Sequence, residues 1–246
     1  MRDYKAEKEM RVAFIRRVLE DSGARGIVYG NSGGKDSALV GILCKLACDD
    51  TLGLILPCGS ERNYGADADD AKAVSKQFGI ENRTVDLKAS ADALKQALAG
   101  ATKLTGDAVA NIAPRLRMTT LYAAAASEGR IVAGTGNRSE GYMGYFTKWG
   151  DGAYDFNPIA DLTVTEIYEF LNHLGAPKSV IEKPPSAGLY DGQTDETEMG
   201  ITYKSIDGYL LTGKCSDGEM EIIDRFHKAS EHKRNLAITY KEGSIE

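Results

Sequence analysis

Residues 26–43 read GIVYGNSGGKDSALVGIL, and this stretch predicts a strand, a glycine-rich turn and a helix. The apolar run Ile27 to Tyr29 has the length of a buried strand, and apolar residues recur at helical spacing between Ala38 and Leu43. The adjacent glycines of the turn allow backbone N–H groups to close around an anion, and the N-terminus of the following helix favours negative charge. The stretch therefore predicts a phosphate-binding loop.

The loop differs from the ordinary P-loop, which reads Gly, four residues, then Gly-Lys-Ser/Thr. In this chain Tyr29 stands in place of the first glycine, and Asp36 stands in place of the serine or threonine. An aspartate beside a bound polyphosphate is repelled unless a divalent cation lies between them. We therefore predict a nucleotide site that uses Mg²⁺. The alternative is a plain strand-to-helix turn in which a serine or aspartate caps the helix.

The chain has 246 residues and a formal net charge of −6, which suits one large α/β domain and argues against nucleic acid as a partner. No apolar run approaches the length of a membrane span, and the N-terminal Met-Arg-Asp-Tyr-Lys lacks the pattern of a signal peptide. We expect a cytoplasmic protein without a membrane partner. Backbone N–H groups, Mg²⁺ and a few lysines and arginines must then bind the anionic ligands locally.

Four cysteines occur, at positions 44, 48, 58 and 215. Cys44 and Cys48 lie four residues apart on the predicted helix, and this spacing could place two ligands near a metal ion. No histidine is close to them in the sequence, and the spacing is not that of a zinc knuckle. Buried free thiols are therefore the favoured interpretation.

Strands and helices alternate through the first half of the chain. A helix over 5–21 is expected to bury the stripe Met10, Phe14, Val18 and Leu19. Further strands are predicted at 52–56, 83–87 and 131–133, and further helices at 66–78, 91–98 and 107–128. The alternation predicts a Rossmann-like, three-layer α/β fold, with a parallel β-sheet flanked by helices on both faces and ligands beyond the carboxyl ends of the strands.

A second loop follows the strand at 131–133 and carries Thr135 and Glu140. The carboxyl ends of parallel strands share one edge of a sheet, so Asp36 and Glu140 are expected to approach the same cation. Two carboxylates, together with phosphate oxygens and waters, make a reasonable Mg²⁺ site. Taken alone, Glu140 could equally be a solvated loop carboxylate.

Several stretches of the chain resemble a known family. Residues 32–37, SGGKDS, resemble the pyrophosphate loop of the ATP pyrophosphatases, a group with the adenine nucleotide alpha hydrolase-like fold. Residues 134–158, 185–200, 203–210 and 231–234 resemble the matching stretches of NAD synthetases, in the same order along the chain. The chain is therefore identified as a member of the NAD synthetase family, with a resemblance that extends from residue 26 to residue 234.

The resemblance implies ATP-dependent amidation of deamido-NAD (nicotinate adenine dinucleotide) to NAD⁺, with release of AMP and pyrophosphate through an adenylated intermediate. ATP and Mg²⁺ would be required, but no protein nucleophile. The residues before Gly26 form little more than one helix, so we expect a single domain over 1–246, no amidohydrolase domain, and free ammonia as nitrogen donor. Relatives are homodimers, and a homodimer is expected here. The alternatives are another ATP pyrophosphatase, such as a GMP synthetase core or a tRNA sulfur-transfer enzyme, and a non-catalytic nucleotide sensor.

The resemblance also assigns site residues. The ATP-binding residues are Gly30, Asn31, Ser32, Gly33, Gly34, Lys35, Asp36, Ser37, Thr135 and Ser186. The groups that hold the metal or the anions during catalysis are Ser32, Asp36, Ser37 and Glu140, with Asp36 and Glu140 as metal ligands. The substrate-binding residues are Arg115, Lys148, Asp155, His232 and Lys233. Each of these last five could instead be a surface charge, a turn residue or part of a solvated helix end.

One position departs from the family. Many members carry a lysine directly after the segment that corresponds to Asp161-Leu-Thr163, where it reaches the nucleotide phosphates, but this chain has Val164. Bacterial relatives often have an uncharged residue at the loop position where this chain has Lys35. The hypothesis is that Lys35 supplies the charge that is missing at position 164.

Overall fold

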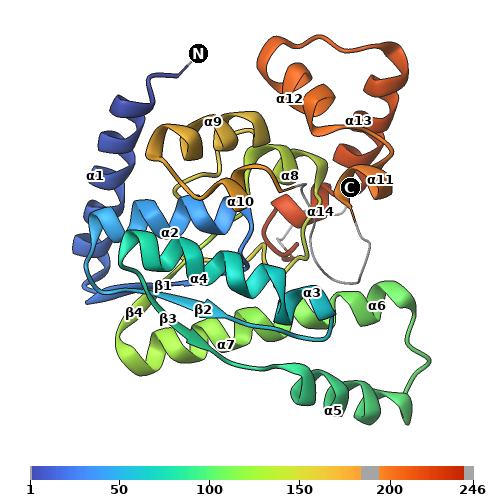
Figure 1. Ribbon diagram of the computed structural model, residues 1–246. Coiled ribbons are helices and arrows are strands. Elements are labelled where there is room, and N and C mark those ends of the chain that lie inside the picture. Colours follow the sequence, from blue (N-terminus) through green and yellow to red (C-terminus); the bar gives the residue numbers. More distant parts are fainter. Residues whose placement is uncertain (1, 184–193, 241–246) are drawn as a thin grey trace.

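A four-stranded parallel sheet forms the centre of the molecule (Figure 1). The computed structural model describes residues 2–183 and 194–240. The strands are β1 (Gly26–Gly30), β2 (Thr51–Ile55), β3 (Glu81–Thr84) and β4 (Arg130–Ala133), in the order β3-β2-β1-β4. All three pairings are parallel, and β1 lies between β2 and β4. The central position of β1 places the loop that follows it in the middle of the sheet's carboxyl edge.

Helices cover both faces of the sheet, as Figure 1 shows. Successive residues of a strand point to opposite faces, so Ile27 and Tyr29 pack in one core and Val28 packs in the other. The first core is covered by α1 (Tyr4–Ser22), α2 (Lys35–Ala47), α4 (Ala66–Phe78), α9 (Val164–Leu174) and α10 (Lys178–Ile181). The second is covered by α5 (Lys88–Ala99) and α7 (Ile112–Glu128). The predicted three-layer α/β fold is confirmed.

A further group of helices comes after the last strand, β4, in the chain. It comprises α8 (Arg138–Met143), α11 (Asp195–Met199), α12 (Tyr203–Thr212), α13 (Asp217–Ala229) and α14 (Glu231–Arg234). Met143, Ile206 and Ile223 are fully buried in a small core between these helices. Because α8 follows β4 directly, this group is joined to the carboxyl edge of the sheet. The short helix α3 (Glu61–Tyr64) lies at the same edge, after β2.

The predicted apolar stripe on the first helix is wrong in part. Met10 and Phe14 are 58% and 45% exposed, whereas Arg11 and Ile15 are buried. The Arg11 guanidinium donates to Glu7 and to Asp161, so paired charges lie where the pattern predicts apolar contact. Burial of an arginine costs little free energy when its guanidinium is fully hydrogen-bonded. The helix therefore turns Arg11 towards the interior and leaves Met10 and Phe14 exposed.

The single helix predicted over 107–128 is two helices, α6 (Gly106–Ala110) and α7. The break falls at Asn111, three residues before Pro114. Proline has no N–H and is tolerated only in the first turn of a helix, so α7 begins just before it. The third strand begins at Glu81, two residues earlier than predicted, because its register is set by pairing with β2.

Two further sequence expectations concern the whole chain. The four cysteines are free thiols, with Cys44 and Cys58 buried and Cys48 and Cys215 partly buried. Within residues 2–183 and 194–240, no helix has the length and apolar character needed to span a bilayer.

Candidate active site

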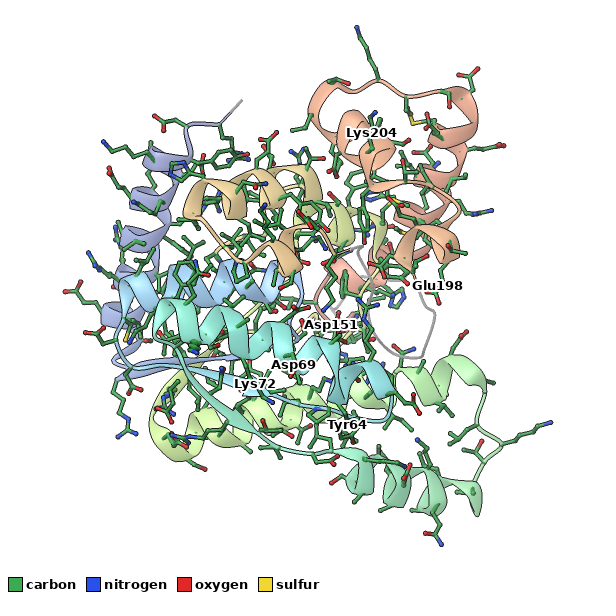
Figure 2. The ribbon with its side chains drawn as sticks, viewed as in Figure 1. Tyr64, Asp69, Lys72, Asp151, Glu198 and Lys204 are labelled. Atoms are coloured by element: carbon green, nitrogen blue, oxygen red, sulfur yellow. The ribbon has the colours of Figure 1, made fainter. Side chains whose placement is uncertain are left out.

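A cavity of about 600 Å³ lies at the carboxyl edge of the sheet. The ends of three strands contribute to its wall through Gly30, Leu54 and Ala133. Helix α7 contributes Pro114 and Arg117, and the C-terminal helices close the opposite side. Figure 2 shows Asp151, one of the lining carboxylates, between the sheet layer and the C-terminal helices. The cavity lies where ligands bind in open α/β sheets.

The loop between β1 and α2 forms one wall of this cavity. Gly33 has φ +75°, and a Cβ atom there would lie 2.0 Å from the Asp67 carbonyl oxygen, so only glycine fits. The Ser32 hydroxyl accepts the Gly34 N–H at 3.3 Å and donates to Ser37 Oγ at 3.1 Å. The loop is therefore held in shape by its own hydroxyl groups, at the N-terminus of a 13-residue helix.

Two carboxylates from the first turns of α2 and α8 converge beside the phosphate-binding loop. The Lys35 Nζ atom lies 2.8 Å from Asp36 Oδ2 and 3.9 Å from Glu140 Oε1. The side chains of Asp36 and Glu140 are only 16% and 19% exposed. Asp36 and Glu140 therefore both lie near the Lys35 ammonium group, and their predicted role as metal ligands stays a prediction.

Asn137 connects the two carboxylates, and the sequence analysis missed it. Its Nδ2 donates to Asp36 Oδ1 at 3.0 Å, and its Oδ1 accepts the Glu140 backbone N–H at 2.9 Å. Glu140 Oε2 in turn accepts the Asn137 N–H at 3.2 Å, which completes a capping box at the start of α8. The spacing Asn-x-x-Glu is a capping-box signature, so the sequence held the pattern from which this residue could have been found.

The charges of this group perturb one another. Burial lowers the pKa of Lys35, but Asp36 and Glu140 outweigh burial and raise it above its ordinary value. Burial, followed by the charge of Asp36, raises the pKa of Glu140. The physical cause is that two poorly solvated carboxylates share one ammonium group. When both carboxylates are ionised, the single ammonium group compensates only one of the two negative charges, and this favours an additional cation.

The donor set fits Mg²⁺. Carboxylate oxygens are the ligands that Mg²⁺ prefers, and it commonly binds one or two carboxylates together with substrate phosphates. Asp36 and Glu140 would supply these oxygens, and their shared contact with the Lys35 ammonium shows that a cation is attracted to this point. Within the described ranges no group of three or more His, Cys, Asp or Glu side chains could hold a metal ion.

The other predicted ATP-binding residues are placed as follows. Gly30 and Thr135 line the cavity. Asn31 also lines it, but its side chain is buried and donates to Ala71, Ser75 and Asn82, away from the loop. Ser186 lies outside the described residues.

Three of the predicted substrate-binding residues lie together. Arg115 donates to the Lys148 carbonyl oxygen, and Lys148 Nζ donates to the His232 carbonyl oxygen. Lys233 turns into the cavity and donates to the Gly144 and Phe146 carbonyl oxygens, both at 2.8 Å. This arrangement joins α7 to α14, and of these four residues only Lys233 lines the cavity.

Asp155 lies apart from this cluster. Its carboxylate accepts the Val132 N–H at 2.7 Å and the Tyr122 hydroxyl at 3.1 Å, at the end of β4. It is exposed, and it is not among the residues that line the cavity.

The cavity also contains charged residues that the sequence analysis did not single out as site residues. Asp151 is exposed at the cavity wall and accepts the Thr147 N–H at 3.0 Å, and desolvation of its carboxylate there raises its pKa. Arg117 donates to the Leu56 carbonyl oxygen and to Asn63, and burial lowers its pKa. Lys183 lies 2.7 Å from both Asp67 and Asp70, beside the loop. These residues come from separate elements, and their sequence spacing gives no sign of a common location.

These features define an α/β protein with a phosphate-binding loop and a carboxylate pair at the carboxyl edge of a parallel sheet. A family model described as NAD synthase matches residues 7–238. An NH₃-dependent NAD⁺ synthetase from Carboxydothermus hydrogenoformans is 45% identical over 237 residues, which cover 95% of this chain and 96% of that relative. The chain belongs to the NAD synthase family. It is therefore an enzyme, a ligase that forms carbon–nitrogen bonds with ATP as co-substrate.

Solved structures agree with this assignment. The structure of NMN synthetase from Francisella tularensis matches with a TM-score of 0.92 and 38% identity, over 98% of this chain and 99% of that one. An NH₃-dependent NAD synthetase from Campylobacter jejuni matches with a TM-score of 0.81 and 27% identity, over 98% of this chain and all of that one. The family predicted from the sequence is confirmed.

Proposed function

We propose that this chain converts deamido-NAD, ATP and ammonia into NAD⁺, AMP and pyrophosphate. The observation that carries the proposal is the convergence of Asp36 and Glu140 on one cation position beside the phosphate-binding loop. The names of the relatives support ammonia as nitrogen donor and NAD⁺ as product. Residues 1–246 are further proposed to form one NAD synthetase domain and to act as a homodimer.

The chemistry explains why ATP is needed. Ammonia cannot displace oxide from a nicotinate carboxylate, so the carboxylate must first gain a better leaving group. A carboxylate oxygen attacks the α-phosphorus of ATP, the bond between the α-phosphorus and the bridging oxygen breaks, and pyrophosphate leaves. Ammonia then attacks the acyl carbon of the adenylate, AMP leaves with the transferred oxygen, and the nitrogen loses its excess proton.

The residues of the loop serve the first step. The N–H groups around Gly33 and Gly34, at the start of α2, stabilise the negative charge that develops on departing pyrophosphate. Asp36 and Glu140 would hold Mg²⁺, which when bound neutralises phosphate charge. Ser32 and Ser37 fix the shape of the loop through their hydroxyl groups. Positioning and electrostatics supply the rate enhancement, because no protein nucleophile takes part.

The substrate is proposed to bind beyond the loop. Lys233 lines the cavity, while Arg115, Lys148 and His232 lie together outside its lining. The dinucleotide carries two phosphates, and the charges of Lys233, Arg115 and Lys148 suit it. Asp155 is proposed as a further contact at the end of β4. Gly30, Asn31 and Thr135 line the cavity and are proposed to contact ATP. Ser186, which lies outside the described residues, is the remaining proposed ATP contact.

A mononucleotide with the same nicotinate ring is the second candidate substrate. The reacting carboxylate would be identical, and the NMN synthetase of Francisella tularensis shares this fold over nearly the whole chain. The two candidates differ only in the adenylate half of the substrate. The binding site for that half decides between them.

The test is an isotope and product assay with both substrates. The purified protein is given ATP, Mg²⁺ and ammonium with deamido-NAD or nicotinate mononucleotide, each carrying ¹⁸O in the carboxylate. The proposal predicts AMP that contains one ¹⁸O, pyrophosphate, and a higher kcat/KM for deamido-NAD. Release of ADP and phosphate, or AMP without ¹⁸O, would overturn the adenylation step. A higher kcat/KM for the mononucleotide would establish the second candidate instead.

The nitrogen donor is tested in the same assay. Glutamine replaces ammonium at equal concentration, and the proposal predicts that turnover falls to the level seen without any donor. Turnover with glutamine that equals turnover with ammonium would refute ammonia as the donor.

A further inference from the structure

The Lys35 ammonium occupies the point at which the two proposed metal ligands converge. It lies 2.8 Å from Asp36 Oδ2 and 3.9 Å from Glu140 Oε1, and its side chain is only 7% exposed. The Tyr203 ring lies beneath it, with the ring centroid 5.7 Å from Nζ. A divalent cation bound by both carboxylates would have to share this space with a like charge.

The charges make the ammonium a competitor of the metal. Two cations held by the same carboxylates repel each other, and the repulsion is strong because the group is poorly solvated. With the ammonium in place, Asp36 is already paired. A metal ion that binds before the nucleotide therefore has to displace Lys35 from Asp36, which weakens its binding.

Lys35 also has an alternative partner close at hand. It is the first residue of α2, directly after Gly34 of the phosphate-binding loop. A lysine side chain has a flexible four-carbon stem and a freely rotating ammonium group, so it reaches different acceptors from one backbone position. When phosphate oxygens are bound by the loop, they offer the ammonium a negative partner that replaces Asp36.

We propose that Lys35 is the resident cation of this site: it pairs with Asp36 and Glu140 before ligands bind, competes with the divalent metal for them, and moves to the phosphates when metal and ATP bind together. The proposal rests on the metal site proposed above. It predicts that Lys35 couples the binding of the divalent metal to the binding of ATP. Metal binding should then be weak without nucleotide, and nucleotide binding should depend less on metal.

The test measures each ligand in the absence of the other. Mn²⁺ binding without nucleotide is followed by electron paramagnetic resonance for the wild type, Lys35→Met and Lys45→Met. Lys45 is on the same helix, ten residues or about 15 Å away, so its variant controls for the loss of one positive charge. Removal of the competing ammonium is expected to lower the Kd for Mn²⁺ by about tenfold or more in Lys35→Met only.

The second measurement has the opposite expected sign. ATP binding in the presence of EDTA is followed by calorimetry, and Lys35→Met is expected to raise the Kd by about tenfold, because an aspartate then faces the polyphosphate without a cation. A folding defect would weaken both ligands, so opposite changes identify the proposed role. Lys35→Arg, which keeps the cation, should retain the weak Mn²⁺ binding of the wild type.

The outcomes are separable from those of the proposed function. Equal or weaker Mn²⁺ binding by Lys35→Met overturns the inference, even when the wild type performs the amidation. If the wild type shows no Mn²⁺ binding with ATP present, the metal site itself is refuted. Should Lys35→Met be too unstable for titration, its melting temperature is measured with and without Mg²⁺. A stabilisation by Mg²⁺ no larger than that of the wild type also overturns the inference.

Discussion

Asn137 and Asp36, which lie 101 residues apart in the sequence, are joined by a 3.0 Å hydrogen bond from Asn137 Nδ2 to Asp36 Oδ1. The same amide accepts the Glu140 N–H through its oxygen. One side chain therefore fixes the distance between the loop after β1 and the helix after β4. Asn137 is 2% exposed, so solvent cannot replace it.

Substitution of Asn137 by alanine is expected to lower kcat/KM by about 10–100-fold, the range found when residues that orient metal ligands are removed. The apparent affinity for Mg²⁺ should fall in parallel, because Asp36 and Glu140 lose their relative position. Steady-state kinetics over a Mg²⁺ titration measure both quantities. Asn172→Ala removes an exposed asparagine that bonds only within α9, and it should leave both unchanged. If excess Mg²⁺ restores none of the kcat/KM that Asn137→Ala loses, the positioning role is contradicted.

Gly33→Ala tests the close approach of the loop to α4. The added Cβ would meet the Asp67 carbonyl oxygen at 2.0 Å in a backbone with positive φ. Strain of this kind is expected to cost about 1–3 kcal/mol of stability, and to raise the Kd for ATP because the loop must move. Calorimetric titration and urea unfolding report these changes.

The matched control is Gly213→Ala, at φ +73° with no atom within 4 Å of the new Cβ. It carries the backbone strain alone, about 1 kcal/mol, and should bind ATP normally. Equal ATP affinity in both variants would show that the loop does not form the nucleotide site.

Asp151→Asn tests a pH dependence of stability. Asp151 is exposed at the cavity wall, but desolvation of its carboxylate there raises its pKa, so over the interval between its unfolded and folded pKa values the folded protein holds a proton that the unfolded chain has released. Stability therefore falls as pH rises through that interval. The asparagine variant, which keeps an oxygen acceptor for the Thr147 N–H, should melt at a higher temperature at neutral pH. Its advantage should shrink as the pH is lowered towards about 4.

Asp161 provides a control of opposite sign. Burial raises its pKa, but the hydrogen bonds and charge of Arg11 outweigh this and lower it, so its ionised form stabilises the fold above its unfolded pKa. Asp161→Asn should therefore melt at a lower temperature at neutral pH, with the loss disappearing in acid. A pH-independent difference for Asp151→Asn would exclude its titration as the cause.

Arg11→Met should destabilise the fold by about 2–3 kcal/mol, because Glu7 and the Pro158 carbonyl oxygen lose a charged donor in a poorly solvated position. Asp161 is half exposed, so water replaces its lost partner and Asp161 adds little to the loss of stability. Urea unfolding measures the change. Arg17→Met removes an exposed i,i+4 partner of Asp21 and should cost less than about 0.5 kcal/mol. Similar losses in both variants would show that the buried network does not hold α1 in place.

The fold and the family could be read from local patterns. The strand, turn and helix around residues 26–43 depend on apolar spacing and on glycines, which are properties of neighbouring residues, and the structure places β1 and α2 there. The second loop could be assigned to the same edge because parallel strands end together. The same rule predicted that Asp36 and Glu140 approach one another, and both contact the Lys35 ammonium group.

Only the tertiary structure decided which charged side chains are buried and which partners they pair with. Arg11 is buried because Asp161 and Pro158, some 150 residues away, supply its acceptors, and no periodicity within α1 carries that information. In the same way, the Lys35 ammonium contacts both Asp36 and Glu140 because the N-termini of α2 and α8 meet there. Local sequence determines secondary structure through short-range sterics and spacing, whereas charge pairing in a buried site depends on the folding of distant segments onto one another.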